Sequence, residues 1–255
     1  MTSQQGITQN TPLNTDSALL RLVAIATMIC DHAGAIFFPQ YIQMRIIGRI
    51  AFPLFCWGIV LGCLYTRDWK KYALRLLIGA LISQGPYMLA LHHTLTELNV
   101  MFTLLLGMLA VTGIQKNKGG SAIWAPLLCL SLAAVFQMDY GWRGVLLMIL
   151  MYLSREKKTA FAATMVAFSL FWGATSSDVS AVFGLSSDSF LSSSQHLVRL
   201  SGMIRTFLRL QGLAILTLPL MLVNTKSGLK LSKWAGYLAY PGHLLLLYGI
   251  NMLLG

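Results

Sequence analysis

The sequence predicts an all-α fold, a polytopic membrane helix bundle of about nine transmembrane helices. Of its 255 residues, 56% are hydrophobic and only 11% are charged, and the mean hydropathy is +0.67. Soluble domains carry about 25% charged residues, so this composition excludes an ordinary soluble protein. Long apolar runs alternate with short polar segments, which is typical of a multi-pass membrane protein.

Each predicted helix is an apolar run bounded by polar or turn-forming residues. The runs cover residues 18–38, 42–65, 72–91, 99–114, 122–137, 141–154, 159–175, 206–223 and 234–254. Several are shorter than the roughly 20 residues that span a bilayer, so the number of crossings can differ from nine by one. Residues 1–17 are polar and contain no basic residue, which argues against a signal peptide. We expect a disordered tail there, followed by a single bundle over residues 18–255.

The lysines predict the direction of the helices. All nine lysines follow the second, fourth, sixth or eighth predicted helix. By the positive-inside rule these segments face the cytoplasm, so we expect the amino terminus inside and the carboxyl terminus outside. The other connections contain no lysine and are expected to face outward. The longest of them, residues 176–205, is rich in serine and is either a linker or a surface that binds a partner.

Charge and cysteine content narrow the functional classes. A formal net charge of +11 would suit a nucleic-acid partner, but the basic residues lie in short clusters between apolar runs, where membrane topology already requires them. We therefore expect no nucleic-acid partner. The four cysteines lie within apolar runs without CxxC spacing, which predicts reduced, buried thiols. No metal site is expected.

A polar pair, Asp31-His32, lies inside the first apolar run. An ionisable residue at membrane depth costs roughly 2.5–3.5 kcal/mol on insertion scales, so Asp31 needs a partner away from lipid. The second helix offers Arg45 and Arg49, which share one helix face because they are four residues apart. The last helix offers His243.

The depths of these residues agree. At a rise of about 1.5 Å per residue, Asp31 and Arg49 both lie about 18 Å from the inner face, and His243 lies at about 14 Å. We therefore expect Asp31, His32, Arg49 and His243 to form one cluster near the midplane. Such a cluster supplies a proton acceptor, an orienting group and a cationic stabiliser. The alternative is that the ion pair and the histidines only fasten the helices together.

Other polar residues of the outward half are candidates for substrate binding. They are Arg45, Asn99, Tyr140, Gln211 and Tyr240. For Asn99, and for Asp139 before Tyr140, a helix cap is the alternative interpretation.

Six motifs stand in order along the chain. They are residues 28–32 (MICDH) with Gly34, 45–55 (RIIGRIAFPLF), 99–104 (NVMFTL), 139–141 (DYG) with Gly144, 211–214 (QGLA) and 237–243 (YLAYPGH). Each motif alone is weak, but their order and spacing resemble the TraX family, whose type member is the F-pilin amino-terminal acetylase of conjugation systems. The resemblance extends from about residue 22 to residue 247.

This resemblance implies an acetyltransferase embedded in the bacterial inner (cytoplasmic) membrane. It implies acetyl-CoA as the acyl donor and the amino terminus of a pilin subunit as the expected acceptor. Through a more distant similarity to transmembrane acyltransferases, His32 is expected to act in the transfer, with Asp31 or Arg49 assisting. His243 is the other candidate for the base. Arg49 would stabilise the oxyanion or fix Asp31.

Coenzyme A is anionic, so its phosphates are expected at the basic inner face. The candidate residues there are Arg67, Lys70, Lys71 and Arg75, although the positive-inside rule by itself also explains their charges. Two other functions stay open. A proton-coupled transporter also places Asp, His and Arg near the midplane, and a non-enzymatic pilus assembly factor would use the cluster to hold helices together.

Overall fold

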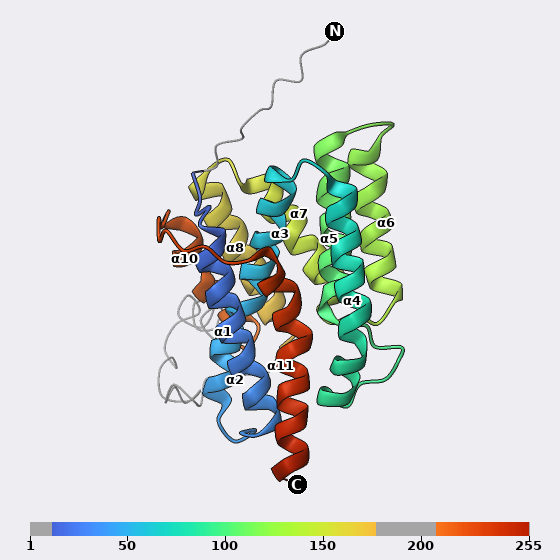
Figure 1. The fold of residues 1–255 in the computed structure, drawn as a ribbon. Coiled ribbons are helices and arrows are strands. Elements are labelled where there is room, and N and C mark those ends of the chain that lie inside the picture. The colour runs from blue at the N-terminus through green and yellow to red at the C-terminus, as the bar shows by residue number, and fades with distance from the viewer. Residues whose placement is uncertain (1–11, 177–207, 255) are drawn as a thin grey trace, which may run out of the picture.

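The computed structural model describes residues 12–176 and 208–254, and in these ranges the chain is helical without strands (Figure 1). This confirms the predicted all-α class. The elements are α1 (Ser17–Ile36), α2 (Ile42–Gly48), α3 (Ala51–Tyr65), α4 (Trp69–Leu91), α5 (Val100–Lys116), α6 (Ser121–Val135), α7 (Gly141–Ser154), α8 (Lys158–Gly173), η2 (Gly212–Thr217), α10 (Leu218–Leu222) and α11 (Lys233–Leu254). The serine-rich segment 176–205 lies outside the described residues apart from Ser176, as do residues 1–11 of the predicted tail.

The bundle is organised around α3 and α5. Helix α5 packs against α3, α4, α6 and α7, while α1 packs against α2, α3 and α11. Helix α11 also contacts α4, so the first and last helices of the chain lie side by side at the front of Figure 1. Apolar side chains of α3, among them Leu54 and Trp57, are almost completely buried, which places this helix in the core.

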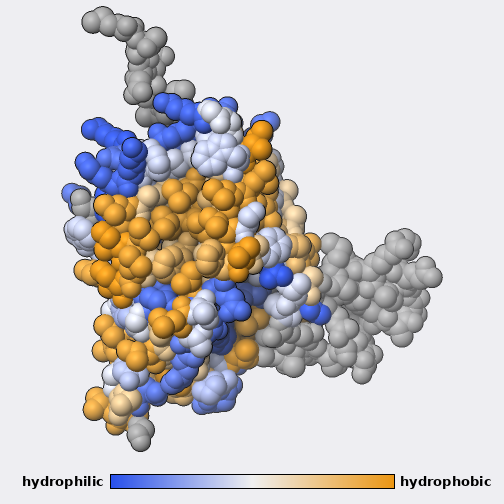
Figure 2. All heavy atoms as spheres, turned by 90° about the vertical axis from the view of Figure 1, so that its right-hand side faces the viewer, coloured by the Kyte–Doolittle hydropathy of each residue, from blue (hydrophilic) through white to orange (hydrophobic). Residues whose placement is uncertain are grey.

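Four described helices or helix pairs are long and apolar enough to cross a membrane: 17–36, 42–65, 69–91 and 234–254. The other predicted spans correspond to shorter helices. Figure 2 shows a band of hydrophobic side chains over the face where α4 and α6 lie, with hydrophilic side chains above and below the band. The exposed apolar residues there include Leu74, Ile78, Leu81 and Ile82 of α4 and Ile123 and Leu127 of α6. The chain is a membrane protein by these criteria.

Three of the connections that carry lysines lie together at one end of the bundle (Figure 1). The turns between α3 and α4, α5 and α6, and α7 and α8 lie at the top of Figure 1, and these are turns that the lysines mark. At the other end, the loops before α5 and before α7 are joined, because Leu98 N donates to Gln137 O at 2.7 Å and Asp139 N donates to Leu98 O at 2.9 Å. The lysine pattern therefore groups these connections as the structure does.

The predicted single helix 42–65 is wrong in one respect, because the structure divides it. Helix α2 ends at Gly48 and α3 begins at Ala51. In a continuous α-helix the amide of residue 53 would donate a hydrogen bond to the carbonyl of Arg49, four residues earlier. Pro53 has no amide hydrogen, so this bond cannot form. The missing hydrogen bond lies at the break between the two helices. The predicted helix 206–223 is also divided, since its described part forms η2 followed by α10.

The predicted disordered tail ends before Ser17. Leu13 and Asn14 are fully buried. The backbone carbonyl of Asn14 accepts a hydrogen bond from Trp57 Nε1 at 2.8 Å, and its side-chain amide donates to Leu220 O at 2.8 Å and to Thr225 Oγ1 at 2.9 Å. These bonds fix the chain before α1 against α3 and the end of α10. Residues 12–16 have no apolar periodicity, so their polar composition predicted a tail.

Replacing Asn14 with alanine is expected to destabilise the protein by about 1–3 kcal/mol. The substitution removes the two hydrogen bonds that the fully buried Asn14 side chain donates to Leu220 O and Thr225 Oγ1, and loss of a partner in a buried contact costs about this much. Thermal unfolding in detergent measures the change. Asn251→Ala, at an exposed position of α11, is the control and is expected to be neutral; equal stability of both variants would contradict the anchoring role.

Candidate functional site

Asp31 lies on the inner face of α1 and binds two arginines. Its Oδ1 accepts from Arg49 Nη2 at 2.6 Å, and its Oδ2 accepts from Arg45 Nη1 at 2.8 Å. Arg49 Nε also donates to the carbonyl of Arg45 at 3.2 Å. Asp31 and Arg49 are buried, whereas the Arg45 side chain is 30% exposed. The predicted partnership between the first two helices is therefore present.

A glycine allows this close approach of α1 and α2. A Cβ atom added at Gly48 would overlap the side chain of Asp31, so any larger residue there must displace the carboxylate. The break between α2 and α3 follows at once and leaves Arg49 at the end of α2, directed at Asp31. The contact between Asp31 and Arg49 therefore depends on two local features of the sequence, the small residue Gly48 and the end of α2 that follows it.

Gly48→Ala is expected to lower the free energy of unfolding by about 1–3 kcal/mol, the usual range for overpacking a tight interior. Gly85→Ala is a matched control, because a Cβ atom there meets no atom within 4 Å. Thermal unfolding of both variants in the same detergent tests the difference. A Gly48 variant as stable as the control would show that α1 and α2 can separate at little cost.

His32 and His243 form the second contact of the site. His32 Nδ1 lies 2.6 Å from His243 Nε2, and the two rings are nearly parallel, with centroids 4.9 Å apart. The other nitrogen of His243, Nδ1, lies 2.7 Å from the carbonyl of Ala239 on the same helix. His243 is buried and His32 is half-buried. Helices α1 and α11 are therefore joined through two imidazoles.

The bonding partners assign the tautomers of this pair. The carbonyl of Ala239 can only accept, so Nδ1 of neutral His243 carries its hydrogen and Nε2 is an acceptor. Nδ1 of His32 must then donate to His243. This leaves Nε2 of His32 with a lone pair that can accept a proton. The hydrogen bond from His32 Nδ1 to His243 Nε2 holds the imidazole of His32 in one orientation.

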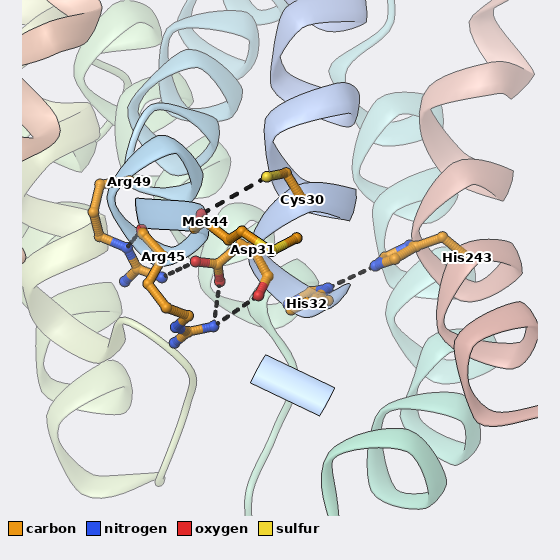
Figure 3. A network of polar contacts seen from close by, with 7 residues as sticks. All are labelled: Cys30, Asp31, His32, Met44, Arg45, Arg49 and His243. Carbon is orange, nitrogen blue, oxygen red and sulfur yellow. Dashed lines mark hydrogen bonds and ion pairs between the residues drawn. The ribbon is translucent and has the colours of Figure 1, made fainter. Parts of the chain in front are cut away.

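The expected single cluster is wrong in its geometry. Figure 3 shows Asp31 directed toward Arg45 and Arg49, while His32 points away from them toward His243. Adjacent residues of a helix are about 100° apart, so Asp31 and His32 cannot share one pocket. The site consists of an ion network on one side of α1 and a histidine pair on the other.

Tyr240 lies beside the histidine pair on α11. Its ring centroid is 5.7 Å from that of His243 and 6.5 Å from that of His32. The side chain is buried, and its hydroxyl has no hydrogen-bond partner within the described part of the chain. Of the predicted substrate-binding residues outside the ion network, Tyr240 is the one that contacts the histidines.

Asn99 has a structural role in the described contacts. Its Oδ1 accepts from Met101 N at 3.0 Å, and its amide donates to Ala80 O at 2.8 Å and to Gln84 Oε1 at 2.9 Å. These bonds occupy both amide hydrogens of Asn99. The helix cap that was the alternative interpretation is therefore present, and the residue also ties α5 to α4.

The remaining outer candidates make their described contacts with residues other than the histidine pair. The Tyr140 ring stacks on Phe52, with centroids 3.7 Å apart, and precedes α7. Asp139 lies in the same loop, where desolvation raises the pKa of its carboxyl to about 6 while Arg49 acts in the opposite direction. Gln211 precedes η2, where its backbone amide donates to Ser176 Oγ at 3.1 Å. Of these, Asp139 and Tyr140 interact electrostatically with Arg49.

A cavity of about 380 Å³ lies between α1, α3, α4, α5 and α11. Arg75 lines it, as does Arg21, which the sequence interpretation did not select because a basic residue at the inner end of a helix is ordinary. The other predicted coenzyme A residues, Arg67, Lys70 and Lys71, lie on the exposed surface near the start of α4. Lys71 is close to Asp68, with Nζ and Oδ2 3.5 Å apart.

Comparison with known proteins agrees with these motifs. The family model described as TraX protein matches residues 16–251. The chain is 31% identical to the "Probable fimbrial assembly protein FimC, serogroup H1" of Dichelobacter nodosus, 28% identical to the "Uncharacterized protein RP591" of Rickettsia prowazekii and 29% identical to the "Protein TraX" of Escherichia coli. These alignments cover 58%, 55% and 66% of this chain.

The same alignments cover 66%, 56% and 69% of the relatives, so the chain spans between about half and somewhat over two thirds of their length. No solved structure is a significant match. The family model, in contrast, extends over nearly the whole bundle, from the residue before α1 to the last turns of α11. The chain therefore belongs to the TraX family.

Proposed function

We propose that this protein is an acetyltransferase of the bacterial inner membrane that moves an acetyl group from acetyl-CoA to an amine. The observation that carries the proposal is the His32–His243 pair, whose hydrogen bonds leave Nε2 of His32 free to accept a proton. An amine must lose a proton when it attacks a thioester, and a neutral imidazole is suited to take it.

The proposed reaction has two steps. The amine nitrogen attacks the thioester carbonyl carbon and forms the new C–N bond while His32 Nε2 takes the amine proton. The tetrahedral intermediate then collapses, the C–S bond breaks, and the thiolate of coenzyme A takes the proton back from His32. The products are an acetamide and free coenzyme A, and His32 returns to its neutral state. His243 holds the imidazole of His32 in orientation through the bond at Nδ1.

Asp31, Arg45 and Arg49 have a positioning role in this mechanism. Arg49 donates to Asp31 and to the carbonyl of Arg45, so of the two roles expected for it, fixing Asp31 fits its contacts. The network fastens α1 to α2 and thereby sets the rotation of α1 that directs His32 toward α11. A base must be held within hydrogen-bonding reach of its proton.

The amino terminus of a pilin-like subunit is the proposed acceptor. One relative carries a name that points to such a partner, the probable fimbrial assembly protein of Dichelobacter nodosus. The free amine of a membrane peptide can approach a site that is buried between helices, whereas a large folded protein cannot.

The test is transfer of labelled acetyl from acetyl-CoA to a peptide with a free amino terminus, by the purified protein in lipid nanodiscs. The same peptide with a blocked amino terminus is the substrate control. Incorporation into the free peptide alone supports the proposal.

Two outcomes would refute the proposal. Absence of transfer to any amine, together with solute flux in proteoliposomes that lack coenzyme A, would favour a proton-coupled transporter. Absence of transfer together with crosslinking to a pilin would favour a non-enzymatic assembly factor.

A further inference from the structure

The cavity between α1, α3, α4, α5 and α11 runs from one end of the bundle to Tyr240, the residue beside the histidine pair. At the end marked by lysines it is lined by Thr66, Arg21 and Arg75, which are partly exposed, and by the exposed Tyr65. At the inner end it reaches Tyr240, whose ring lies beside both imidazoles. The cavity therefore extends from the basic surface to a residue that adjoins the proposed base.

The interior of this cavity is mainly apolar. Its walls include Met28, Leu54, Ile59, Leu76 and Leu104. Protein interiors are close-packed, and empty volume loses packing contacts. A cavity of about 380 Å³ has the size of a small-molecule site, which typically has apolar walls and a few polar groups.

The polar groups stand at the two ends. The Arg75 guanidinium lies 5.8 Å from the centroid of the Tyr72 ring, and the stem of Arg21 lies close to Gly236 of α11. None of the described residues that line the cavity is acidic. The outer end is thus suited to an anion, and the inner end presents the unpartnered hydroxyl of Tyr240.

We propose that this cavity holds the extended thioester arm of the acyl donor. The inference rests on the proposed acetyl transfer. Arg21 and Arg75 hold the phosphates of coenzyme A at the outer end, the pantetheine arm fills the apolar part, and the Tyr240 hydroxyl donates a hydrogen bond to the thioester carbonyl. From Arg21 to His32 the helix rises about 16 Å, a length that the extended pantetheine arm can cover. The acetyl group then reaches His32 while still attached to coenzyme A, and no carrier within the membrane is needed.

A glycine makes this inference testable without disturbing the fold. Gly58 lines the cavity, and a Cβ atom added there meets no atom within 4 Å. Gly58→Leu therefore places a side chain in the open space. Gly249→Leu is the matched control, because Gly249 also has no atom within 4 Å of an added Cβ and lies at an exposed position of α11.

Binding of coenzyme A to the purified protein in nanodiscs, measured by calorimetry, is the primary readout. We expect Gly58→Leu to weaken binding at least roughly tenfold and to raise the KM for acetyl-CoA, while Gly249→Leu matches the parent protein. Arg21→Ala and Arg75→Ala should raise the KM for acetyl-CoA with little change in kcat. Acetyl-pantetheine has no phosphates. With this donor, Gly58→Leu should still raise the KM, whereas Arg21→Ala and Arg75→Ala should not.

The outcomes separate this inference from the proposed function. If the parent protein transfers acetyl but Gly58→Leu binds coenzyme A equally well, the cavity assignment is wrong and the proposed function stands. If a phospholipid copurifies in the cavity and Gly58→Leu displaces it without affecting coenzyme A, the assignment is likewise overturned. If the parent protein binds coenzyme A in the cavity but transfers acetyl to no amine, the proposed function fails instead.

Discussion

Replacing His32 with alanine is expected to lower kcat for acetyl transfer by about 10²- to 10⁴-fold, the usual contribution of a general base. The reason is that His243 donates to the carbonyl of Ala239 and accepts from His32 Nδ1. These two hydrogen bonds leave Nε2 of His32 as the nitrogen that can accept a proton. His92→Ala is the matched control, because His92 lies in the exposed loop after α4. Initial rates with labelled acetyl-CoA, at equal thermal stability of both variants, measure the effect.

Variants of His243 distinguish the role of its imidazole from that of the His32 imidazole. His243→Ala should reduce kcat less than His32→Ala, because the base remains and only its orientation is lost. His243→Gln, whose side-chain oxygen can accept from His32 Nδ1, should restore part of the rate. The double variant of His32→Ala and His243→Ala should be no slower than His32→Ala alone, because the effects on the rate of substituting residues that act as one unit do not add. A larger loss for His243→Ala than for His32→Ala would reverse the assignment of the base.

The second large effect is expected at Arg49. Arg49→Ala removes the buried partner of Asp31 and leaves a carboxylate without its shorter ion pair, which should lower the free energy of unfolding by about 3–5 kcal/mol. Arg45→Ala should cost less, because the Arg45 side chain is 30% exposed and ion pairs open to solvent contribute little. Chemical or thermal unfolding in a single detergent compares the two variants.

A double-mutant cycle tests whether Asp31 and Arg49 act as a pair. If they do, the cost of Asp31→Ala combined with Arg49→Ala will be smaller than the sum of the single costs. Additive costs would mean that the two side chains contribute independently. In either case, intact acetyl transfer by a folded Arg49→Ala variant would contradict the positioning role of the network.

Much of the fold could be predicted because membrane helices obey local rules. The apolar length of each run predicted most helices within a few residues, and the lysines grouped the turns that lie at one end of the bundle. The errors arose where tertiary contacts outweigh composition. Asn14 lies in a polar segment and is nevertheless buried by bonds to Trp57 and Leu220, which are distant in sequence.

The sequence by itself determined which chemical groups make up the site. Buried charges in an apolar helix require partners, and this identified Asp31 with the two arginines and placed His32 and His243 at one depth. Depth along each helix depends only on the number of residues. Rotation about the helix axis depends on neighbours, and it cannot be read from a single segment.

Tertiary structure decided how those groups are divided between the two sides of α1. Packing of α2 against one side of α1 and of α11 against the other separated the carboxylate from the imidazoles, although Asp31 and His32 are adjacent in sequence. The same packing oriented His243 so that His32 keeps the free nitrogen, and it left the cavity that ends at Tyr240. Side-chain direction and empty space arise from the contacts between helices, so only the folded arrangement could reveal them.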